Sequence, residues 1–388
     1  MKILLVSPFD FSFPGGVNEH VLHLDRQFQL LGHQTRVLSP RSDEEDEGDD
    51  GHYYRLGVTF PVPSNGSTAR ITLSPFLSGK VKEFLQREEF DVVHLHEPLA
   101  PILPLMVLLH SKAVNIGTFH AARSSNLGYL YAKPILSHFA GKLDARIAVS
   151  PAALDFVHQY FPGQYEVIPN GIDIDWFGPH VEPILRYRDG HPNILFVGRY
   201  NESRKGLKFL LRAFALVRQE FPLARLLVVG HGTPKRFERE IERSELENVV
   251  FVGPVTKQGL ANYYATCDVF CAPSTGRESF GIVLLEAMAS SKPVVATNIR
   301  GYSAVVRHGI DGLLVQRKNP EALAIALVHL LADEKMREEF GLAGRRRAEE
   351  YSWPVVAKRV LETYERTRSR VGWQRLSQPI PTYFTSRR

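Results

Sequence analysis

The chain has 388 residues, a length that predicts two or three domains rather than one. Its apolar share of 44% is typical of globular proteins, and no apolar run approaches the roughly 18 residues needed to span a membrane. Seven of the 42 acidic residues lie within 43–50, which we expect to be a solvated, mobile loop. The rest of the chain, with 47 Lys and Arg residues, is basic and suits an anionic nucleotide or lipid, and no motif is typical of nucleic-acid binding.

The N-terminal stretch predicts the opening of a doubly wound α/β domain. Lys2–Ser7 is an apolar strand, too short for the core of a signal peptide. A loop rich in Pro and Gly follows, and apolar residues then recur at helical spacing from Val17 to Leu31. Gln34–Leu38 is the next strand. The loop lacks G-x-G-x-x-G, so it does not predict nicotinamide binding.

The remainder of the first half alternates strands and helices after an irregular segment. Residues 43–75 are rich in Pro, Asn and Gly, which predicts an insert made of turns. A helix is predicted over about Pro75–Glu88. Further strands are predicted over Asp91–His96, Val114–Phe119, Arg146–Ser150 and Glu166–Pro169, and Asn170-Gly171 then marks a turn.

The second half restarts the same alternation. Leu207–Phe221 is predicted as a helix, and the chain is expected to be helical from about Asn319 to Arg370. Such alternation predicts a parallel sheet covered on both faces, so two such domains would place the carboxyl ends of their strands around one ligand-binding cleft. The predicted strands are Asn193–Val197, Arg225–Val229, Val249–Val252, Asp268–Cys271, Pro293–Ala296 and Gly312–Val315.

The segment Arg277–Met288 is the strongest candidate for a ligand site. Glu278 and Glu286 lie eight residues apart, with Gly281 and the start of an apolar helix between them. The first amides of a helix lack internal partners and favour an anion such as a diphosphate. Glu286 would lie about 12 Å further along the helix, at 1.5 Å per residue. The two carboxylates therefore suit two parts of an elongated ligand such as a sugar nucleotide.

Basic and imidazole groups supply the other candidates. Arg199 and Lys205 flank a turn after the first strand of the second half, where they can bind phosphate oxygens. His120 ends a strand of the first half and can exchange a hydrogen bond with a sugar hydroxyl. His94 and His96 share a strand face and are expected to pack and hydrogen-bond rather than bind a metal, because no third ligand is evident.

Two further patterns are given structural roles. Cys267 and Cys271 are expected to be buried free thiols in a reducing cytosol. Asp173-Ile174-Asp175 is a D-x-D pattern, which can bind a metal, but it follows the predicted turn at Asn170-Gly171 and we do not assign a metal to it.

The Glu278–Glu286 segment, filled with Ser-Phe-Gly-Ile-Val, resembles the E-x7-E element of retaining glycosyltransferases of family 4. The resemblance implies a GT-B fold: two doubly wound Rossmann-like domains, 1–172 for the acceptor and 173–351 for the nucleotide sugar. A helix over 352–370 would cross back to the first domain, and 371–388, with Pro379 and Pro381, would be a flexible tail.

The same resemblance implies roles for the candidates. Glu278 would hold the sugar, Glu286 the ribose, and Arg199 with Lys205 the donor diphosphate, while the segment at Val255 would lie near the base. The implied catalytic residues are His120, Arg199, Lys205 and Glu278. The implied donor site comprises Gly16, Arg199, Lys205, Val255, Glu278, Phe280, Gly281, Ile282, Val283 and Glu286.

Strings of the first half narrow the resemblance to the phosphatidyl-myo-inositol mannosyltransferases. They include Pro14–Val21, His96-Glu97-Pro98 and Pro63–Arg70. The implied reaction moves mannose from GDP-mannose, without a required metal or tightly bound cofactor, onto phosphatidylinositol. The implied location is cytoplasmic and peripheral on the inner face of the cell membrane. The acceptor would bind at Phe9, Gly16, Asn18 and Arg70; Phe9 and Asn18 depart from the Tyr and Gln of the family pattern.

Two alternatives remain open at this stage. A transferase of the same family could use another nucleotide sugar with diacylglycerol or a soluble acceptor. A non-catalytic module that binds nucleotide sugars would carry the same Glu278–Glu286 segment and the same basic loop.

Overall fold

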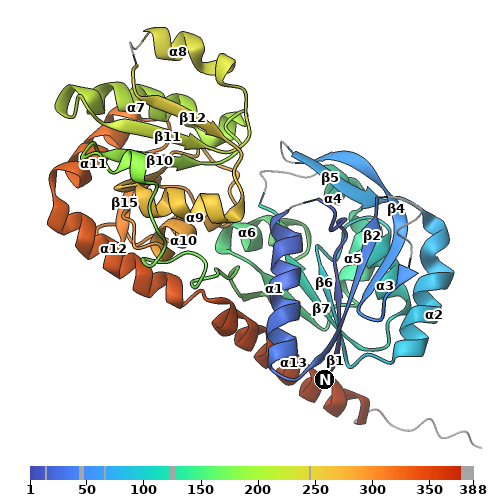
Figure 1. Cartoon of the computed structure of the whole chain (residues 1–388). Coiled ribbons are helices and arrows are strands. Elements are labelled where there is room, and N and C mark those ends of the chain that lie inside the picture. The colour runs from blue at the N-terminus through green and yellow to red at the C-terminus, as the bar shows by residue number, and fades with distance from the viewer. Residues whose placement is uncertain (14, 43–47, 65–66, 123–126, 244–245, 377–388) are drawn as a thin grey trace, which may run out of the picture.

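In the computed structural model the apolar runs form two α/β domains, which lie side by side (Figure 1). The structure describes residues 1–13, 15–42, 48–64, 67–122, 127–243 and 246–376. The backbone alone is considered for 63–64, 67–69, 75 and 374–376.

The first domain is built on a sheet centred on its N-terminal strand. Within the described residues this sheet has nine strands, in the order β3-β4-β2-β1-β6-β7-β8-β9 with β5 paired to β4. Adjacent strands from β2 to β9 in this order pair in parallel, whereas β4 and β5 form an antiparallel pair. The strands are β1 (Lys2–Val6), β2 (Gln34–Arg41), β3 (Gly48–Asp49), β4 (Tyr53–Ser64), β5 (Ser67–Thr72), β6 (Val92–His96), β7 (Val114–Phe119), β8 (Ala145–Ala148) and β9 (Glu166–Val167).

Alternating side chains of these strands bury against helices on both faces, as the predicted doubly wound domain requires. Leu4 packs with the helices α2 and α3, whereas its neighbour Leu5 packs with α1 and α13, because successive residues of a strand point to opposite faces. The helices of the first domain are α1 (Gly16–Leu30), α2 (Ser78–Glu88), α3 (Leu103–His110), α4 (Leu127–Tyr131), α5 (Lys133–Ala140) and α6 (Pro151–Tyr160).

The second domain repeats this architecture with a smaller sheet. Its six strands, in the order β12-β11-β10-β13-β14-β15, are parallel throughout the described residues. The strands are β10 (Asn193–Val197), β11 (Arg225–Val229), β12 (Val249–Gly253), β13 (Val269–Ala272), β14 (Val294–Thr297) and β15 (Gly312–Val315). The helices are α7 (Leu207–Glu220), α8 (Glu238–Arg243), α9 (Lys257–Thr266), α10 (Ile282–Ala289), α11 (Pro320–Ala332) and α12 (Glu334–Glu349).

The last helix, α13 (Trp353–Leu376), runs from the second domain back along the first (Figure 1). Its apolar residues Trp353 and Tyr364 belong to the core of the first domain, and Arg368 pairs with Asp91 at 2.9 Å. The predicted crossing helix is therefore present, but it ends at Leu376 rather than near residue 370. The expected tail is thus helical over its first residues, and 377–388 lie outside the described residues.

The segment 43–75 is not the irregular insert that was predicted. It contains the antiparallel pair β4 and β5, in which Pro61 and Pro63 lie opposite Arg70 and Thr68. Proline donates no hydrogen bond to a ladder and argued against a strand, yet it is tolerated at sheet edges. The sequence Asn65-Gly66 between the strands is in fact a strong hairpin signal.

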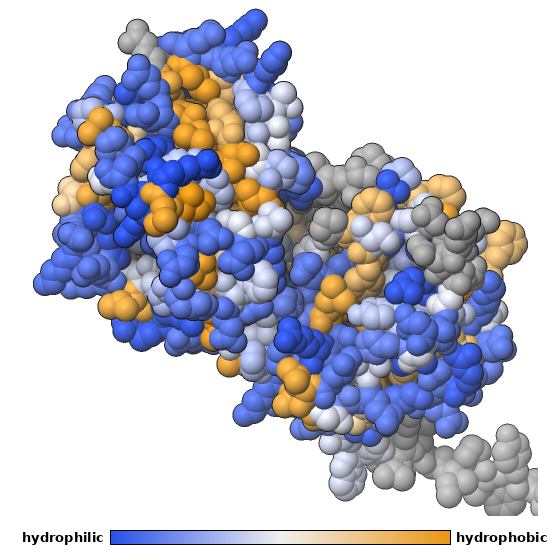
Figure 2. Space-filling model, in the orientation of Figure 1, coloured by the Kyte–Doolittle hydropathy of each residue, from blue (hydrophilic) through white to orange (hydrophobic). Residues whose placement is uncertain are grey.

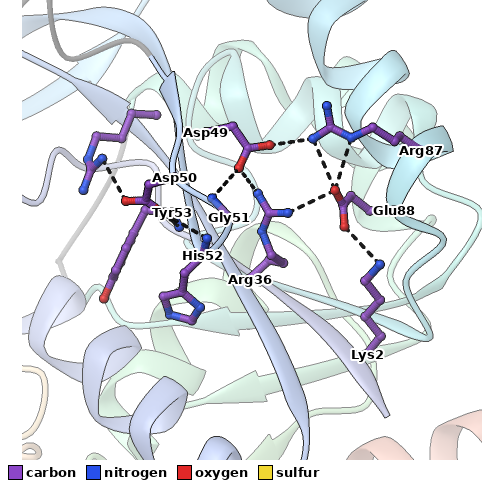
Figure 3. A network of polar contacts seen from close by, with 10 residues as sticks. Lys2, Arg36, Asp49, Asp50, Gly51, His52, Tyr53, Arg87 and Glu88 are labelled. Carbon is purple, nitrogen blue, oxygen red and sulfur yellow. Dashed lines mark hydrogen bonds and ion pairs between the residues drawn. The ribbon is translucent and has the colours of Figure 1, made fainter.

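The acidic run is partly paired rather than solvated. Asp49 forms ion pairs with Arg36 of β2 and Arg87 of α2, and Glu88 binds Lys2 and Arg36 at 3.0 Å (Figure 3). These five basic and acidic groups tie β3 to the amino ends of β1 and β2, at the edge of the sheet remote from the strand carboxyl ends. The run's residues 43–47 lie outside the described residues.

The carboxyl ends of the two sheets point to one region between the domains, where α/β folds bind ligands. The loop after β13 reaches the first domain there, because Ser279 Oγ donates a hydrogen bond to the carbonyl oxygen of His120 at the end of β7. We call this region the interdomain site. In the described part of the chain, no helix is long and apolar enough to cross a membrane.

Candidate active site

Two loops of the second domain bring charged side chains together at the interdomain site. Arg204 and Lys205 come from the loop after β10, and Glu278 comes from the loop after the neighbouring strand β13. Glu278 Oε1 lies 2.6 Å from Arg204 Nη1 and 2.7 Å from Lys205 Nζ. All three side chains are largely buried, so the carboxylate offsets the cost of holding two cations close together.

Arg199, predicted to bind phosphate, is held by a second carboxylate in the same loop. Its Nε lies 3.1 Å from Glu202 Oε1, and Glu202 Oε2 lies 2.5 Å from Arg204 Nη2. The Arg199 side chain is 53% exposed, whereas that of Glu202 is 10% exposed. The sequence analysis did not assign Arg204 and Glu202 to the site, because a loop of mixed charges is typical of an exposed surface. Their position between Arg199 and Lys205 was the signal that could have indicated a site role.

The helix α10 begins where the sequence predicted an anion site. Gly281 precedes its first residue with φ +88°, and a Cβ there would lie 2.6 Å from the ring of Tyr302. Only glycine meets both conditions without strain. The amides of Ile282 and Val283 open the helix, and such amides carry partial positive charge that favours an anion.

The side chain of Phe280, a predicted donor-site residue, is buried inside the second domain. Phe280 is 4% exposed and packs in the core of the second domain, with its ring 5.8 Å from that of Tyr351. This buried ring anchors the loop, and Phe280 can contact a ligand there only through its backbone. Val255, after β12, also packs against this core while remaining partly exposed.

Glu286 lies further along α10, in an environment unlike that of Glu278. Tyr264 donates a hydrogen bond to its Oε2 at 2.7 Å. Burial raises the pKa of Glu286 from 4.5 to about 6, although the Tyr264 hydrogen bond and the charges of Lys257 and Lys205 act in the opposite direction. Hydrogen bonds from hydroxyl groups, such as those of a ribose, would stabilise the charge of this poorly hydrated carboxylate. Tyr264 was not foreseen from the sequence.

On the first domain, His120 is fixed by backbone as well as side-chain contacts. Its amide donates to Glu97 Oε1 at 2.7 Å, its carbonyl accepts from Ser279, and its Nε2 lies 3.0 Å from His96 Nδ1. His120 is 9% exposed. The structure therefore places this predicted catalytic residue directly beside the loop that carries Glu278.

His120 belongs to a cluster of buried imidazoles. His20 of α1 packs edge-on against His120 and bonds Asn170 Oδ1 through Nδ1 at 2.9 Å, and its pKa is lowered by burial to about 4. Burial also lowers the pKa of His94 to about 3 and those of His96 and His120 well below the usual value. These groups are neutral at physiological pH. The predicted hydrogen-bonding role of His94 and His96 is confirmed.

The predicted acceptor residues lie around the loop after β1. Arg70 of β5 stacks over the ring of Phe13, 4.1 Å from its centroid, and Phe9 is half-buried in the same loop. Gly16 opens α1 with nothing within 4 Å of a Cβ built on it, which leaves room for a ligand. The loop therefore joins Arg70 to the first turn of α1.

Asn18, a predicted acceptor residue, forms hydrogen bonds with the loop after β1. Its Oδ1 accepts from Ser7 Oγ at 2.8 Å, and its Nδ2 donates to the carbonyls of Asp10 and Phe13 at 2.7 and 3.3 Å. The residue is 4% exposed. In this structure the Asn18 amide thus holds the loop after β1 in place.

The remaining patterns have structural roles. Asp173 Oδ1 accepts from the amide of Trp176 at 3.0 Å, as expected of a turn. Cys267 and Cys271 are buried free thiols, as predicted. Within the described residues, no group of three or more His, Cys, Asp or Glu side chains is arranged to hold a metal ion.

Comparison with known proteins decides the family. Residues 14–176 match the family "Glycosyltransferase Family 4", and 191–333 match "Glycosyl transferases group 1". The phosphatidyl-myo-inositol mannosyltransferase of Mycobacterium tuberculosis is 37% identical over 373 residues, covering 94% of this chain and 97% of that protein. The chain belongs to the family 4 glycosyltransferases. The phosphatidyl-myo-inositol mannosyltransferase of Propionibacterium freudenreichii is 36% identical over 94% of each chain.

Solved structures agree with the fold of this glycosyltransferase. The Anabaena protein HepE in complex with UDP has a TM-score of 0.75 at 22% identity, covering 94% of this chain and all of that one. A glycosyltransferase from Rickettsia africae has a TM-score of 0.74 at 21% identity, with 94% and 98% of the two chains covered. These likenesses establish the predicted GT-B fold, in which two α/β domains meet at the site.

Proposed function

We propose that this glycosyltransferase moves mannose from GDP-mannose, with retention of configuration, onto a phosphatidylinositol-type lipid. The observation that carries this proposal is the 37% identity over 94% of the chain to an enzyme named phosphatidyl-myo-inositol mannosyltransferase. The arrangement of the charged groups supports it, because each part of a nucleotide sugar meets a suitable partner at the interdomain site.

The diphosphate would bind at the loop after β10. Arg199, Arg204 and Lys205 converge there, and the start of α10 adds its partial positive charge. These groups stabilise the negative charge that develops on the departing diphosphate, a large contribution in such reactions. They supply the positive charge without a metal ion. Glu286 would accept hydrogen bonds from the ribose hydroxyls.

The sugar would lie between Glu278 and His120. Glu278 is engaged by Arg204 and Lys205, so it orients the sugar rather than attacking it. We therefore propose front-face displacement, in which the acceptor hydroxyl attacks on the side from which the diphosphate leaves. The acceptor inositol would approach from the loop after β1, past Gly16, with Arg70 near the lipid phosphate.

Peripheral binding to the inner face of the cell membrane is part of the proposal. Large apolar side chains are exposed on the first domain, and Figure 2 shows such orange atoms among hydrophilic ones over that lobe. Phe76 is 89% exposed and is followed on α2 by the exposed Lys80 and Lys82. An apolar surface with adjacent basic residues suits an anionic bilayer. Further exposed apolar residues of the first domain include Phe13, Phe60, Leu73, Leu127, Leu130, Tyr131 and Ile135; Leu30, Leu31 and Leu109 are exposed as well.

The test offers several acceptors to the purified chain with labelled GDP-mannose. Vesicles of anionic lipid would contain phosphatidylinositol or diacylglycerol, and free inositol and inositol phosphate would be offered in solution. We expect labelled phosphatidylinositol and salt-sensitive sedimentation with the vesicles. Preference for diacylglycerol or a soluble acceptor would reject the lipid assignment while keeping the transferase. If neither hydrolysis of GDP-mannose nor transfer of mannose is detected, a non-catalytic module that binds nucleotide sugars is favoured.

A soluble acceptor is the second candidate, and one comparison favours it. The D-inositol 3-phosphate glycosyltransferase of Jonesia denitrificans is 26% identical over 394 residues, covering 91% of this chain. Both candidate acceptors carry an inositol ring and a phosphate, so the site around Gly16 and Arg70 suits either. The inositol phosphate arm of the same assay separates them.

A further inference from the structure

A chain of buried hydrogen bonds leads from α13 towards the interdomain site. Tyr364 Oη lies 2.6 Å from His94 Nδ1, and His94 Nε2 lies 2.6 Å from Thr118 Oγ1. Both ring nitrogens of His94 are thereby engaged. His96, on the same face of β6, bonds His120 instead, with 3.0 Å between His96 Nδ1 and His120 Nε2.

The second ring nitrogen of His96 has no such partner. His96 is fully buried, and within the described residues no hydrogen bond reaches its Nε2. The rings of His94 and His20 pack against it, with centroids 4.3 and 5.2 Å away. An unpaired polar atom in such a place restricts where the proton of the ring can be.

A single hydrogen bond joins His96 Nδ1 and His120 Nε2, so one ring must donate its proton and the other must accept it. Burial keeps both rings neutral because it lowers their pKa values well below the usual 6.5, so each ring carries one N–H. If His120 donated, His96 would carry its proton on Nε2 and bury an N–H without an acceptor. If His96 donates, Nε2 is left as a bare lone pair. Among backbone groups, a buried N–H without a partner is rarer than an under-used acceptor, and we apply the same rule to these two rings.

We propose that His96 is a positioning residue that donates its Nδ1 proton to Nε2 of His120 and so fixes the tautomer of His120. His120 then carries its own proton on Nδ1, where it donates to a hydroxyl oxygen of the bound sugar. The identity of that ligand rests on the proposed function. Hydrogen bonds to Glu97 and Ser279 already fix the backbone of His120. The choice of which ring nitrogen of His120 carries the proton is then determined by His96.

The first test observes the tautomer directly. The full chain is labelled with ¹⁵N-histidine, long-range ¹H–¹⁵N spectra are recorded without ligand, and His120→Asn assigns the His120 signals. We expect a protonated, pyrrole-type Nδ1 and a pyridine-type Nε2 for His120. The opposite tautomer, or a rapid mixture of both, would overturn the proposal. This result does not depend on activity, so it is separable from failure of the proposed function.

The second test uses variants in the GDP-mannose transfer assay. His96→Leu removes the donor, whereas His96→Asn keeps a donor nitrogen near the position of Nδ1. For His96→Leu we expect about a tenfold lower kcat, the effect of one hydrogen bond. The KM for GDP-mannose should change less than about twofold. For His96→Asn we expect most of kcat to return, together with the wild-type His120 tautomer. The control His158→Leu, on the exposed face of α6, should match the wild type.

A purely structural role gives a different pattern. In that case both His96 variants would lose activity in parallel with their melting temperatures, and the His120 tautomer would be the same in the wild type and in His96→Asn and His96→Leu. That outcome would overturn the proposal. If His96→Leu does not fold, the wild-type spectrum still tests the proposed tautomer, together with the kcat and the His120 tautomer of His96→Asn.

Discussion

Replacing Glu278 by Gln should separate donor binding from sugar transfer. The change keeps the shape of the side chain but removes the charge that faces Arg204 at 2.6 Å and Lys205 at 2.7 Å. Because the site becomes more positive, GDP should bind at least as tightly as in the wild type. Turnover should nevertheless fall by about 10²-fold, the usual effect of a reacting group misplaced by about 1 Å.

The stability effect of Glu278→Gln can be bounded from the same contacts. Breaking a buried ion pair costs about 3–5 kcal/mol when a charge is left unpaired. Here Arg204 keeps Glu202 at 2.5 Å and the amide still accepts a hydrogen bond, so we expect about 2 kcal/mol in the free energy of unfolding. Urea denaturation followed by circular dichroism measures this value.

Glu240→Gln is a matched control. The Glu240 side chain is 12% exposed, close to the 11% of Glu278, and it also faces one Arg and one Lys, namely Arg212 at 2.6 Å and Lys208 at 3.8 Å. It lies on α8, outside the proposed machinery. We expect some loss of stability, with turnover per folded molecule unchanged. The reasoning is refuted if Glu278→Gln keeps wild-type turnover, or if both variants lose it equally.

Three further predictions address other contacts. GDP affinity should fall as the pH drops below about 6, because protonation removes the Glu286 charge that we propose accepts hydrogen bonds from the ribose hydroxyls. Titration calorimetry from pH 5 to 8 should show this fall in the wild type and not in Glu286→Gln. Tyr364→Phe should lower the free energy of unfolding by about 1–3 kcal/mol, since it leaves buried His94 Nδ1 unpaired, and an unchanged urea midpoint would argue against that hydrogen bond. Arg300→Ala removes an exposed ion pair to Asp155 between the domains and should leave the melting temperature unchanged; a clear decrease would show that the pair holds the domains together.

Most of the fold could be predicted from local sequence. The strands of both sheets are short β-branched runs bounded by turn residues, so their positions depended little on the rest of the chain. The hairpin of β4 and β5 was missed because Pro61 and Pro63 argued against a strand, and edge position is a property of the assembled sheet. The continuation of α13 to Leu376 depends on its packing along the first domain.

The candidate site was predictable where it follows from strand order. Lys205 and Glu278 meet because β10 and β13 are neighbours, and loops at the carboxyl ends of adjacent parallel strands lie together. The roles of Arg204, Glu202 and Tyr264 depend on side-chain directions within loops and between helices, which periodicity does not encode. The hydrogen bonds from Asn18 of α1 to three groups of the loop after β1 also could not be predicted, because they depend on how that loop folds.

The anomeric configuration of the product tests the central account most directly. The chain would be incubated with GDP-α-D-mannose and phosphatidylinositol in anionic vesicles, and the purified product would be examined by NMR. The account predicts mannosylated phosphatidylinositol with an α linkage, because the acceptor attacks on the face from which the diphosphate leaves. A β-linked product would contradict the proposed retaining site of Glu278, Lys205 and His120, and no mannosyl lipid at all would contradict the proposed donor and acceptor.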